Sequence, residues 1–445
     1  MPRPDSFIVI ALLTVLVALG PVSTDLYLPS LPGLTAALDA DVASVQLTLS
    51  LFLAGLASGQ LLWGPVADRY GRRPVLIVGL SIYCVASVAC TIAGSIELLV
   101  VGRFVQAFGA AVGPTLCRAI VRDVHGRSGT GRVMSYLSAA VAVAPMIAPI
   151  FGGFVEVWFG WRANMAALVL YGSFALLATV LILPETNPAP DATATHVRRM
   201  FGNYAMFLRN RLYLGYLFGV AFAYAGIFCF ISGSSFVLVD LVGVTPDVYG
   251  FCFGAIVIGY IVGSTAGGKL SRRLAPDRLV RIGSFFMLAG AGAILIFALT
   301  GDPSVVTIVG PTIVFMIGVG LTMPSAYAGA LIPFPRAAGA ASSLVGFIQM
   351  SFAALVGLGI GHVYDETALP MAGAMALVAG GAALAYWLIV RPAAKRATKR
   401  KCPLKARIWH AGRRNVVNGC PLDGSGSLVR VAPGGTGAGQ ARPLS

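Results

Sequence analysis

The sequence is poor in charged residues. Of its 445 residues only 11% are Asp, Glu, Lys or Arg, whereas 57% are hydrophobic, and the mean hydropathy is +0.83. Soluble domains carry about 25% charged residues, so a soluble fold of this composition could not cover its surface with polar groups. The composition excludes an ordinary soluble protein and predicts a membrane protein.

Several signatures of catalysis and of cofactor binding are also missing. The sequence has no GxxxxGK[ST] pattern for nucleotide phosphates, no HExxH metal motif and no nucleophile elbow. Its seven cysteines lack the spacing of a disulfide framework, and Cys402, His410 and Cys420 are not spaced as zinc ligands. We therefore expect neither an enzyme nor an ATP-driven pump, and no catalytic residue, metal or cofactor.

The basic residues are concentrated in the last part of the chain. The 32 Lys and Arg contribute to a net charge of +15, but twelve of them, with a single acid, follow residue 390. Residues 392–445 are rich in Gly, Pro and Arg without apolar periodicity, which predicts a disordered cytoplasmic tail. The stretch "KRATKRK" (395–401) suits contact with anionic lipid. Nucleic acid is the other partner that a basic tail suggests, but no folded binding motif accompanies it, so we expect none.

Long apolar runs fill the rest of the chain. A helix needs roughly 20 apolar residues to cross a hydrocarbon core about 30 Å thick, and helices satisfy their own backbone hydrogen bonds in lipid. We therefore predict an all-α membrane protein with twelve transmembrane helices. The first run could instead be a cleaved signal peptide, but it continues past signal length without an evident cleavage site. The twelve runs lie at 7–27, 43–65, 75–95, 97–120, 132–156, 163–183, 212–236, 247–268, 279–299, 304–328, 339–362 and 368–390.

The basic residues of the loops predict the orientation. The loops after the even-numbered runs hold sixteen Lys and Arg, whereas the loops after the odd-numbered runs hold one, Arg162. An excess of basic residues marks cytoplasmic loops. Both termini are therefore predicted to be cytoplasmic, and odd-numbered spans run outward.

The spans divide into two similar halves. The longest polar connection, 185–211, is a predicted cytoplasmic loop that separates an N-terminal half (1–184) from a C-terminal half (212–391). The stretch "GPVADRYGRR" from Gly64 has a weaker counterpart, "GGKLSRR" from Gly267, 203 residues later. A parallel repeat of six spans builds one large class of secondary transporters, with the substrate site near the midplane between the halves.

The "GPVADRYGRR" stretch concentrates charge between two spans. Its acid and arginines can form charge-assisted hydrogen bonds at a helix junction, and its two outer glycines are expected to allow close approach and a tight turn. A simple solvated basic loop is the alternative. The residues concerned are Gly64, Asp68, Arg69, Gly71, Arg72 and Arg73, with Asp123 at the end of the fourth span as a further acid.

Two opposite charges are predicted to lie inside spans. Asp25, in "GPVSTDLYLPSLP", ends the first span, and Arg103 lies about six residues into the fourth, with Gln106 one turn further. A charge inside a span is costly and points to function. Because the two spans run in opposite directions, both charges fall near the outer side, and we expect them to pair across a cavity. The alternatives are a water-exposed cap at Asp25 and an arginine that reaches the outer interface.

Two further spans carry polar or helix-breaking residues. In the fifth, "VAVAPMIAPIFGGF", Pro145 and Pro149 are expected to bend the helix, and Gly152 and Gly153 to let a neighbour pack closely. Ordinary enrichment of Pro and Gly in membrane helices is the alternative. In the eleventh span Gln349 is the single amide, and it either lines a cavity or packs between helices.

In this order along the chain, these stretches resemble the major facilitator superfamily. The "GPVADRYGRR" stretch resembles its motif between the second and third helices. The resemblance implies that the acid and the arginines of this motif hold the cytoplasmic side closed, together with an acid at the end of the fourth helix, a position that Asp123 occupies here. "VVGRFVQAF" resembles the fourth-helix motif, whose arginine is implicated in proton coupling, although Ala107 stands where a glycine is common. "APMIAPIFGG" resembles the antiporter motif of exporters, with Ala148 in place of the usual glycine.

Three more stretches resemble the Bcr/CflA drug-resistance exporters: "DLYLPSLP" (25–32), "RAIVRDV" (118–124) and "PFPRAAGAASSLVGFIQM" (333–350). The resemblance covers about residues 7–390. It implies a secondary transporter that exports drugs or small toxic metabolites in exchange for protons. A proton-coupled importer of a small metabolite or sugar is the alternative, and the antiporter-like stretch disfavours it. A receptor or a membrane enzyme would need larger loops.

The expected mechanism alternates protonation with substrate binding. Asp25 is the best candidate for the proton-carrying carboxylate, because the other acids fall in loops or at span ends. Arg103 would respond to its charge, and Gln106 and Gln349 would contribute to the cavity. The expected partners are a small-molecule substrate, protons and lipid, and we expect a monomeric, multi-pass protein of the bacterial inner membrane that is driven by the proton gradient.

Overall fold

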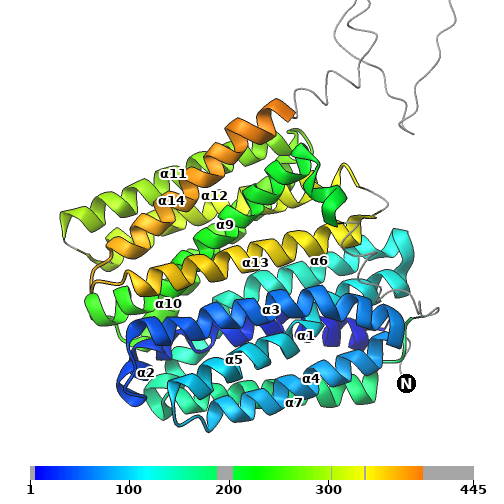
Figure 1. The fold of residues 1–445 in the computed structure, drawn as a ribbon, viewed down its shortest axis with the longest axis horizontal. Helices are drawn as coiled ribbons and strands as arrows, with labels where there is room; N and C mark the ends of the chain where they lie inside the picture. The colour runs from blue at the N-terminus through cyan, green and yellow to red at the C-terminus, as the bar shows by residue number, and fades with distance from the viewer. Residues whose placement is uncertain (1–5, 188–203, 302, 335–336, 394–445) are drawn as a thin grey trace, which may run out of the picture. The chain divides into compact units, whose positions relative to one another are not determined.

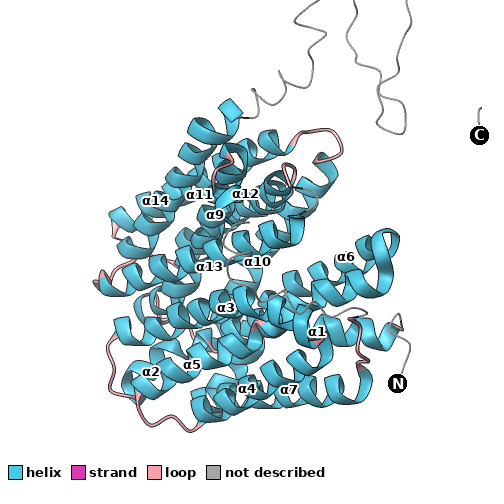
Figure 2. Cartoon of the chain, turned by 45° about the vertical axis from the view of Figure 1, so that its right-hand side comes forward, coloured by secondary structure: helices cyan, strands magenta, loops and turns pink. Residues whose placement is uncertain are grey.

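The computed structural model describes residues 6–187, 204–301, 303–334 and 337–393, with the side chains at 125–132, 135, 140 and 338 left out. Most of the predicted central loop and nearly all of the predicted tail therefore lie outside the described residues. Within them every regular element is a helix (Figure 2). Twelve segments are long and apolar enough to cross a membrane, which confirms the twelve predicted spans.

The elements follow one another without insertion of a separate domain among the described residues. The first half holds α1 (Phe7–Asp25), η1 (Leu28–Ser30), α2 (Leu31–Ala37), α3 (Val42–Tyr70), α4 (Arg72–Thr91), α5 (Ile96–Ala110), α6 (Val112–Phe159) and α7 (Trp161–Ile182). The second half holds α9 (Arg211–Ser235), η2 (Phe236–Leu241), α10 (Pro246–Leu270), α11 (Pro276–Thr300), α12 (Val305–Leu331), α13 (Ala338–His362), α14 (Leu369–Ala385) and η4 (Tyr386–Val390).

Polar residues that cap the N-termini of several helices explain where these helices begin. The side chain of Asp41 accepts a hydrogen bond from the backbone of the first turn of α3, and Ser95 does so for α5. Asn210 caps α9, and Ser304 forms a capping box at α12. Each cap satisfies backbone N–H groups that the helix itself leaves unpaired.

The element α6 contains the second part of the fourth span and all of the fifth. Gly113 lies against the carbonyl of Leu16, and Cys117, four residues later, donates a hydrogen bond to the carbonyl of Leu13, so the first part of α6 runs antiparallel to α1. Gly152, much later, lies against the carbonyl of Leu26, so the chain has by then returned to the level of the last residues of α1. The chain reverses its direction between the fourth span, which ends at Val124, and the fifth span, which begins at Tyr136.

Close contacts at glycine repeat between the halves. A Cβ added at Gly55 or Gly59 of α3 would lie within 2.9 Å of atoms of the α5 segment, and a Cβ at Gly259 or Gly263 of α10 would do the same against α12. The second pair follows the first by 204 residues. The two halves therefore share not only a sequence spacing but also one packing arrangement, in which their second and fourth spans meet backbone to backbone.

Two large helix contacts join the halves. Helix α3 packs against α13, and α6 packs against α10; Figure 1 shows α3 in blue beside α13 in yellow. We call the end of the bundle that holds Asp68–Arg73 the arginine-rich end, and the other the opposite end. Because α1 starts near the former, its last residue, Asp25, lies toward the opposite end.

Candidate functional site

A cavity of about 320 Å³ lies between the two halves. Helices α1, α3 and α6 of the first half and α9, α10, α12 and α13 of the second contribute to its wall. Most lining side chains are apolar, and the polar ones are few. Of the residues predicted for function, the wall contains Asp25, Gln349 and Pro145, whereas Arg103 and Gln106 do not line it.

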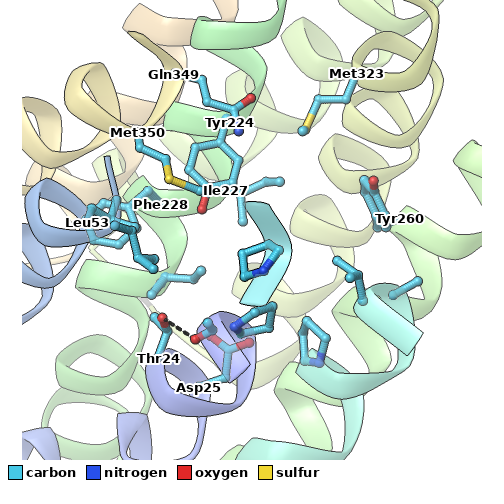
Figure 3. A pocket seen from close by; sticks show the side chains of 18 of the residues that line it. Thr24, Asp25, Leu53, Tyr224, Ile227, Phe228, Tyr260, Met323, Gln349 and Met350 are labelled. Atoms are coloured by element: carbon cyan, nitrogen blue, oxygen red, sulfur yellow. Dashed lines mark hydrogen bonds between the residues drawn. The ribbon is translucent and has the colours of Figure 1, made fainter. Parts of the chain in front are cut away.

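The carboxylate of Asp25 stands at one end of this cavity (Figure 3). Asp25 is only 3% exposed, which contradicts the alternative of a water-exposed cap. Among the described residues it accepts no hydrogen bond and forms no ion pair. An ionised carboxylate in such surroundings is costly unless it is paired, so this group is suited to take up a neutralising partner, either a proton or a cation.

Arg103 is fully buried away from the cavity, so it does not reach the outer interface. Its guanidinium donates from Nη1 to Oε1 of Gln106 at 2.6 Å and from Nη2 to the carbonyl of Ser23 at 2.9 Å. The rings of Tyr27 and Phe52 lie 4.3 and 4.1 Å from it, distances typical of cation–π contacts. The Arg103 guanidinium thus ties helix α5 to the last turn of α1.

The expected ion pair between Asp25 and Arg103 does not form in this structure. The guanidinium instead binds a backbone carbonyl two residues before Asp25, at the C-terminal end of a helix, where the unpaired carbonyls attract a cation. Any influence of Arg103 on Asp25 in this state therefore acts through the backbone of α1 and through long-range charge, not through a direct contact.

A small network surrounds Gln106. Its amide Nε2 donates to Oγ of Ser87 at 2.7 Å, and the hydroxyls of Ser23 and Tyr83 are 2.7 Å apart. These polar groups are buried and come from α1, α4 and α5. The network positions the helices around Arg103. In this structure Gln106 binds the arginine and does not line the cavity.

Gln349 lies in the cavity wall, on α13 (Figure 3). Its side-chain oxygen is buried without a hydrogen-bond partner among the described residues. Nearby, Nε2 of Gln60 donates to Sδ of Met350 at 3.2 Å, a contact that joins the halves. Because Gln349 lines the cavity, the structure favours the cavity over helix packing as its place.

The charged residues of the "GPVADRYGRR" stretch meet at the arginine-rich end. Nη1 of Arg72 lies 2.6 Å from Oδ1 of Asp68, and its Nε donates to Oδ2 of Asp123 at 3.1 Å. Arg73 donates to the carbonyl of Val180, and Arg69 stacks over Tyr70 at 5.1 Å. The structure thus brings Asp68, Arg72 and Asp123 together, as the resemblance implies, through one of the three arginines.

The two glycines of this stretch differ. Gly71 has φ of 99°, and a Cβ there would lie 2.6 Å from Oε2 of Glu185, so the predicted tight turn is present. The expectation of close approach at Gly64 is wrong. Gly64 lies inside α3, and the nearest atom to an added Cβ, on Thr115, would be 3.9 Å away.

Glu185 completes the arginine-rich end and was not predicted from the sequence. Its carboxylate accepts hydrogen bonds from the backbone N–H of Arg72 and Arg73, at the start of α4, and of Thr186 and Asn187. Burial alone would raise the pKa of Glu185, but these backbone donors outweigh it and hold the pKa below its ordinary value. The group therefore stays ionised and anchors the end of α7 to α4 until the pH falls below its lowered pKa.

The glycines of the fifth span pack against both halves. A Cβ at Gly152 would lie 1.8 Å from the carbonyl oxygen of Leu26, and one at Gly153 would lie 2.3 Å from that of Pro246, in α10. Helix α6 continues through Pro145 and Pro149. The predicted close packing is therefore present, and it lies toward the opposite end, next to Asp25.

A second carboxylate close to this contact was also missed. Glu156 of α6 accepts a hydrogen bond from Oγ of Ser30, and Nδ2 of Asn164 donates to that same Oγ at 2.9 Å and to the carbonyl of Gly152 at 3.0 Å. The cluster joins η1, α6 and α7. No sequence spacing could reveal it, because Ser30 and Glu156 are 126 residues apart.

Comparisons with known proteins agree with this architecture. The Major Facilitator Superfamily model matches residues 12–358. The chain is 33% identical to an uncharacterized MFS-type transporter, YdgK, of Bacillus subtilis over 84% of this chain and 94% of that protein. It is 29% identical to a bicyclomycin resistance protein homolog of Haemophilus influenzae, over 87% of this chain and 97% of that protein. It is 31% identical to multidrug resistance protein MdtL of Escherichia coli, over 77% of this chain and 88% of that protein.

Among solved structures, the chain resembles the xylose transporter XylE of E. coli in a partially occluded inward-open conformation. The TM-score is 0.69 with 14% sequence identity, over 86% of this chain and 97% of that one, which is a likeness of fold. The family match, the twelve spans and the bacterial relatives identify a multi-pass transporter of the bacterial inner membrane, not an enzyme. The chain belongs to the Major Facilitator Superfamily.

Proposed function

We propose that this protein exports drugs or small toxic metabolites from the cell in exchange for protons. The observation that carries the proposal is the unpartnered carboxylate of Asp25 in a largely apolar cavity between two repeated halves. A proton and a substrate would compete for the cavity, so that loading of one favours release of the other. The relatives named for bicyclomycin and multidrug resistance support export, and the basic loops support a cytoplasmic arginine-rich end.

A susceptibility panel tests the direction and the substrates. The chain is expressed in an efflux-deficient host and exposed to phenicols, bicyclomycin and sulfonamides, with an empty vector as the control. Export predicts that at least one compound becomes less toxic and that its addition to inverted vesicles with a preformed proton gradient releases protons. Greater sensitivity to these compounds, or uptake of a nutrient with protons into intact cells, would contradict export and favour an importer.

We further propose that the Asp68–Arg72–Asp123 cluster stabilises closure of the arginine-rich end. Asp68→Asn should lower the transport rate several-fold with expression retained, because Asp68 is exposed and its pair with Arg72 contributes only about 0.2–1 kcal/mol. Transport in whole cells and the amount of protein in membranes are measured together. Asp277→Asn, which changes an acid without an ion pair among the described residues, is the matched control. An unchanged rate in Asp68→Asn would rule out the latch.

A further inference from the structure

The cavity wall contains an arginine other than the one expected to face Asp25. Arg118 lies in the early part of α6, is exposed and lines the cavity. Among the described residues its side chain makes neither a hydrogen bond nor an ion pair. An unpaired arginine inside a membrane span points to function, and nothing in the network around Arg103 uses this one.

Arg118 and Asp25 stand at different depths of the same cavity. The neighbour of Arg118, Cys117, contacts the carbonyl of Leu13, which is twelve residues before Asp25 on α1. At about 1.5 Å per residue the two charges are separated by roughly 18 Å along the helix axis. The cavity therefore has an acidic side chain toward the opposite end and a basic side chain toward the arginine-rich end, too far apart for direct contact.

The wall between these charges suits an aromatic or apolar body. Tyr224, Tyr260 and Tyr327 contribute phenol groups, and Met323 and Met350 contribute thioethers. Thioethers make favourable contacts with aromatic rings and adapt to different shapes. The volume is that of a site for a small molecule. The polar groups that can orient a ligand are then the side chains of Gln349, Asp25 and Arg118.

We propose that Arg118 binds an anionic oxygen group of the substrate, such as a carboxylate, and that the cavity thereby prefers aromatic acids over neutral analogues of the same size. The planar guanidinium offers two parallel donors to such a group, and Asp25 remains available to the proton at the other end. The inference rests on the proposed transport function and specifies its substrate class.

Binding to the purified full-length protein tests the proposal without a gradient. The probes are nalidixate, an aromatic carboxylate, and its carboxamide, which has the same shape but no charge; each dissociation constant is measured by equilibrium dialysis. The wild type is expected to prefer the acid about 10-fold, which is what a charge-assisted hydrogen bond of about 1.4 kcal/mol provides. Arg118→Gln should remove most of this preference, and Arg118→Lys should restore part of it.

Arg122→Gln is the matched control. Arg122 lies one turn further along α6, is exposed and does not line the cavity, so its loss should leave the acid-to-amide ratio at the wild-type value. Gel filtration and thermal melting verify that each variant is folded. No acid preference in the wild type, the same preference in Arg118→Gln, or equal loss in Arg122→Gln would overturn the role of Arg118.

The two proposals fail separately. If the protein binds the acid through Arg118 but moves no compound in the vesicle assay, the export function is wrong and the binding inference stands. If compounds are exported but the acid and the amide bind equally, export stands and the assignment of Arg118 is wrong.

Discussion

Replacing Asp25 by asparagine is expected to reduce proton-driven transport to the level of cells without the transporter. Asparagine has nearly the same size but cannot exchange a proton, so the competition between proton and substrate is lost. The protein should still fold and insert, because the Asp25 carboxylate has no hydrogen-bond partner among the described residues that its removal would strand. Proton release from inverted vesicles on addition of substrate measures the effect directly.

A conservative variant and a control variant accompany this experiment. Asp25→Glu keeps the carboxylate and should retain part of the coupled transport. Asp240→Asn removes a carboxylate near the same end that does not line the cavity, and it should transport like the wild type. Wild-type proton release from Asp25→Asn, with normal amounts of protein in the membrane, would show that another group carries the proton.

Loss of the Arg103 guanidinium is expected to damage both stability and transport. In Arg103→Met the carbonyl of Ser23 and the side-chain oxygen of Gln106 lose their donor in a buried place. Breaking a buried, hydrogen-bonded charge in this way typically costs roughly 3–5 kcal/mol. Arg103→Lys should lose less stability than Arg103→Met but should not reach the wild type. An ammonium keeps the charge, but it cannot stack on Tyr27 and Phe52 and bind both oxygens at once.

Thermal unfolding of the purified protein and transport in vesicles test this prediction together. Arg162→Met is the control: that arginine is exposed, although it too stacks on an aromatic ring, that of Trp161, and donates to one carbonyl. Its loss should change the free energy of unfolding by about 1 kcal/mol or less. If Arg103→Met melts and transports like the wild type, the buried network is not what holds α1 against α5.

The spans and their grouping were predictable because they depend on length and composition. Twelve apolar runs had to be helices in lipid, and their repeat at about 204 residues reappears as matching glycine contacts. The depth of Asp25 could also be approximated from residue counts along a helix. The rotation of each helix about its own axis could not be predicted in this way, because it depends on how the side chains of neighbouring helices pack against each other.

Rotation decides which arginine shares the cavity with Asp25. Arg103 and Arg118 belong to the same span, and Arg103 was the arginine expected to face Asp25. Packing turns Arg103 toward Tyr27 and Phe52 and leaves Arg118 on the cavity wall. Glu185 and Glu156 were missed for a related reason, since their partners are far away in sequence and their roles follow only from the assembled bundle.

The glycine contacts beside Asp25 bear on the kinetics of transport. At Gly152, Gly153 and Gly250 the main chains of α6, α10 and the segment after α1 touch without intervening side chains. Separating the main chains at Gly153 and Gly250 requires no change of rotamer, whereas the rings of Phe154 and Phe251 beside them must part. The barrier between the two access states would then include solvation of newly exposed backbone as well as local repacking of these rings.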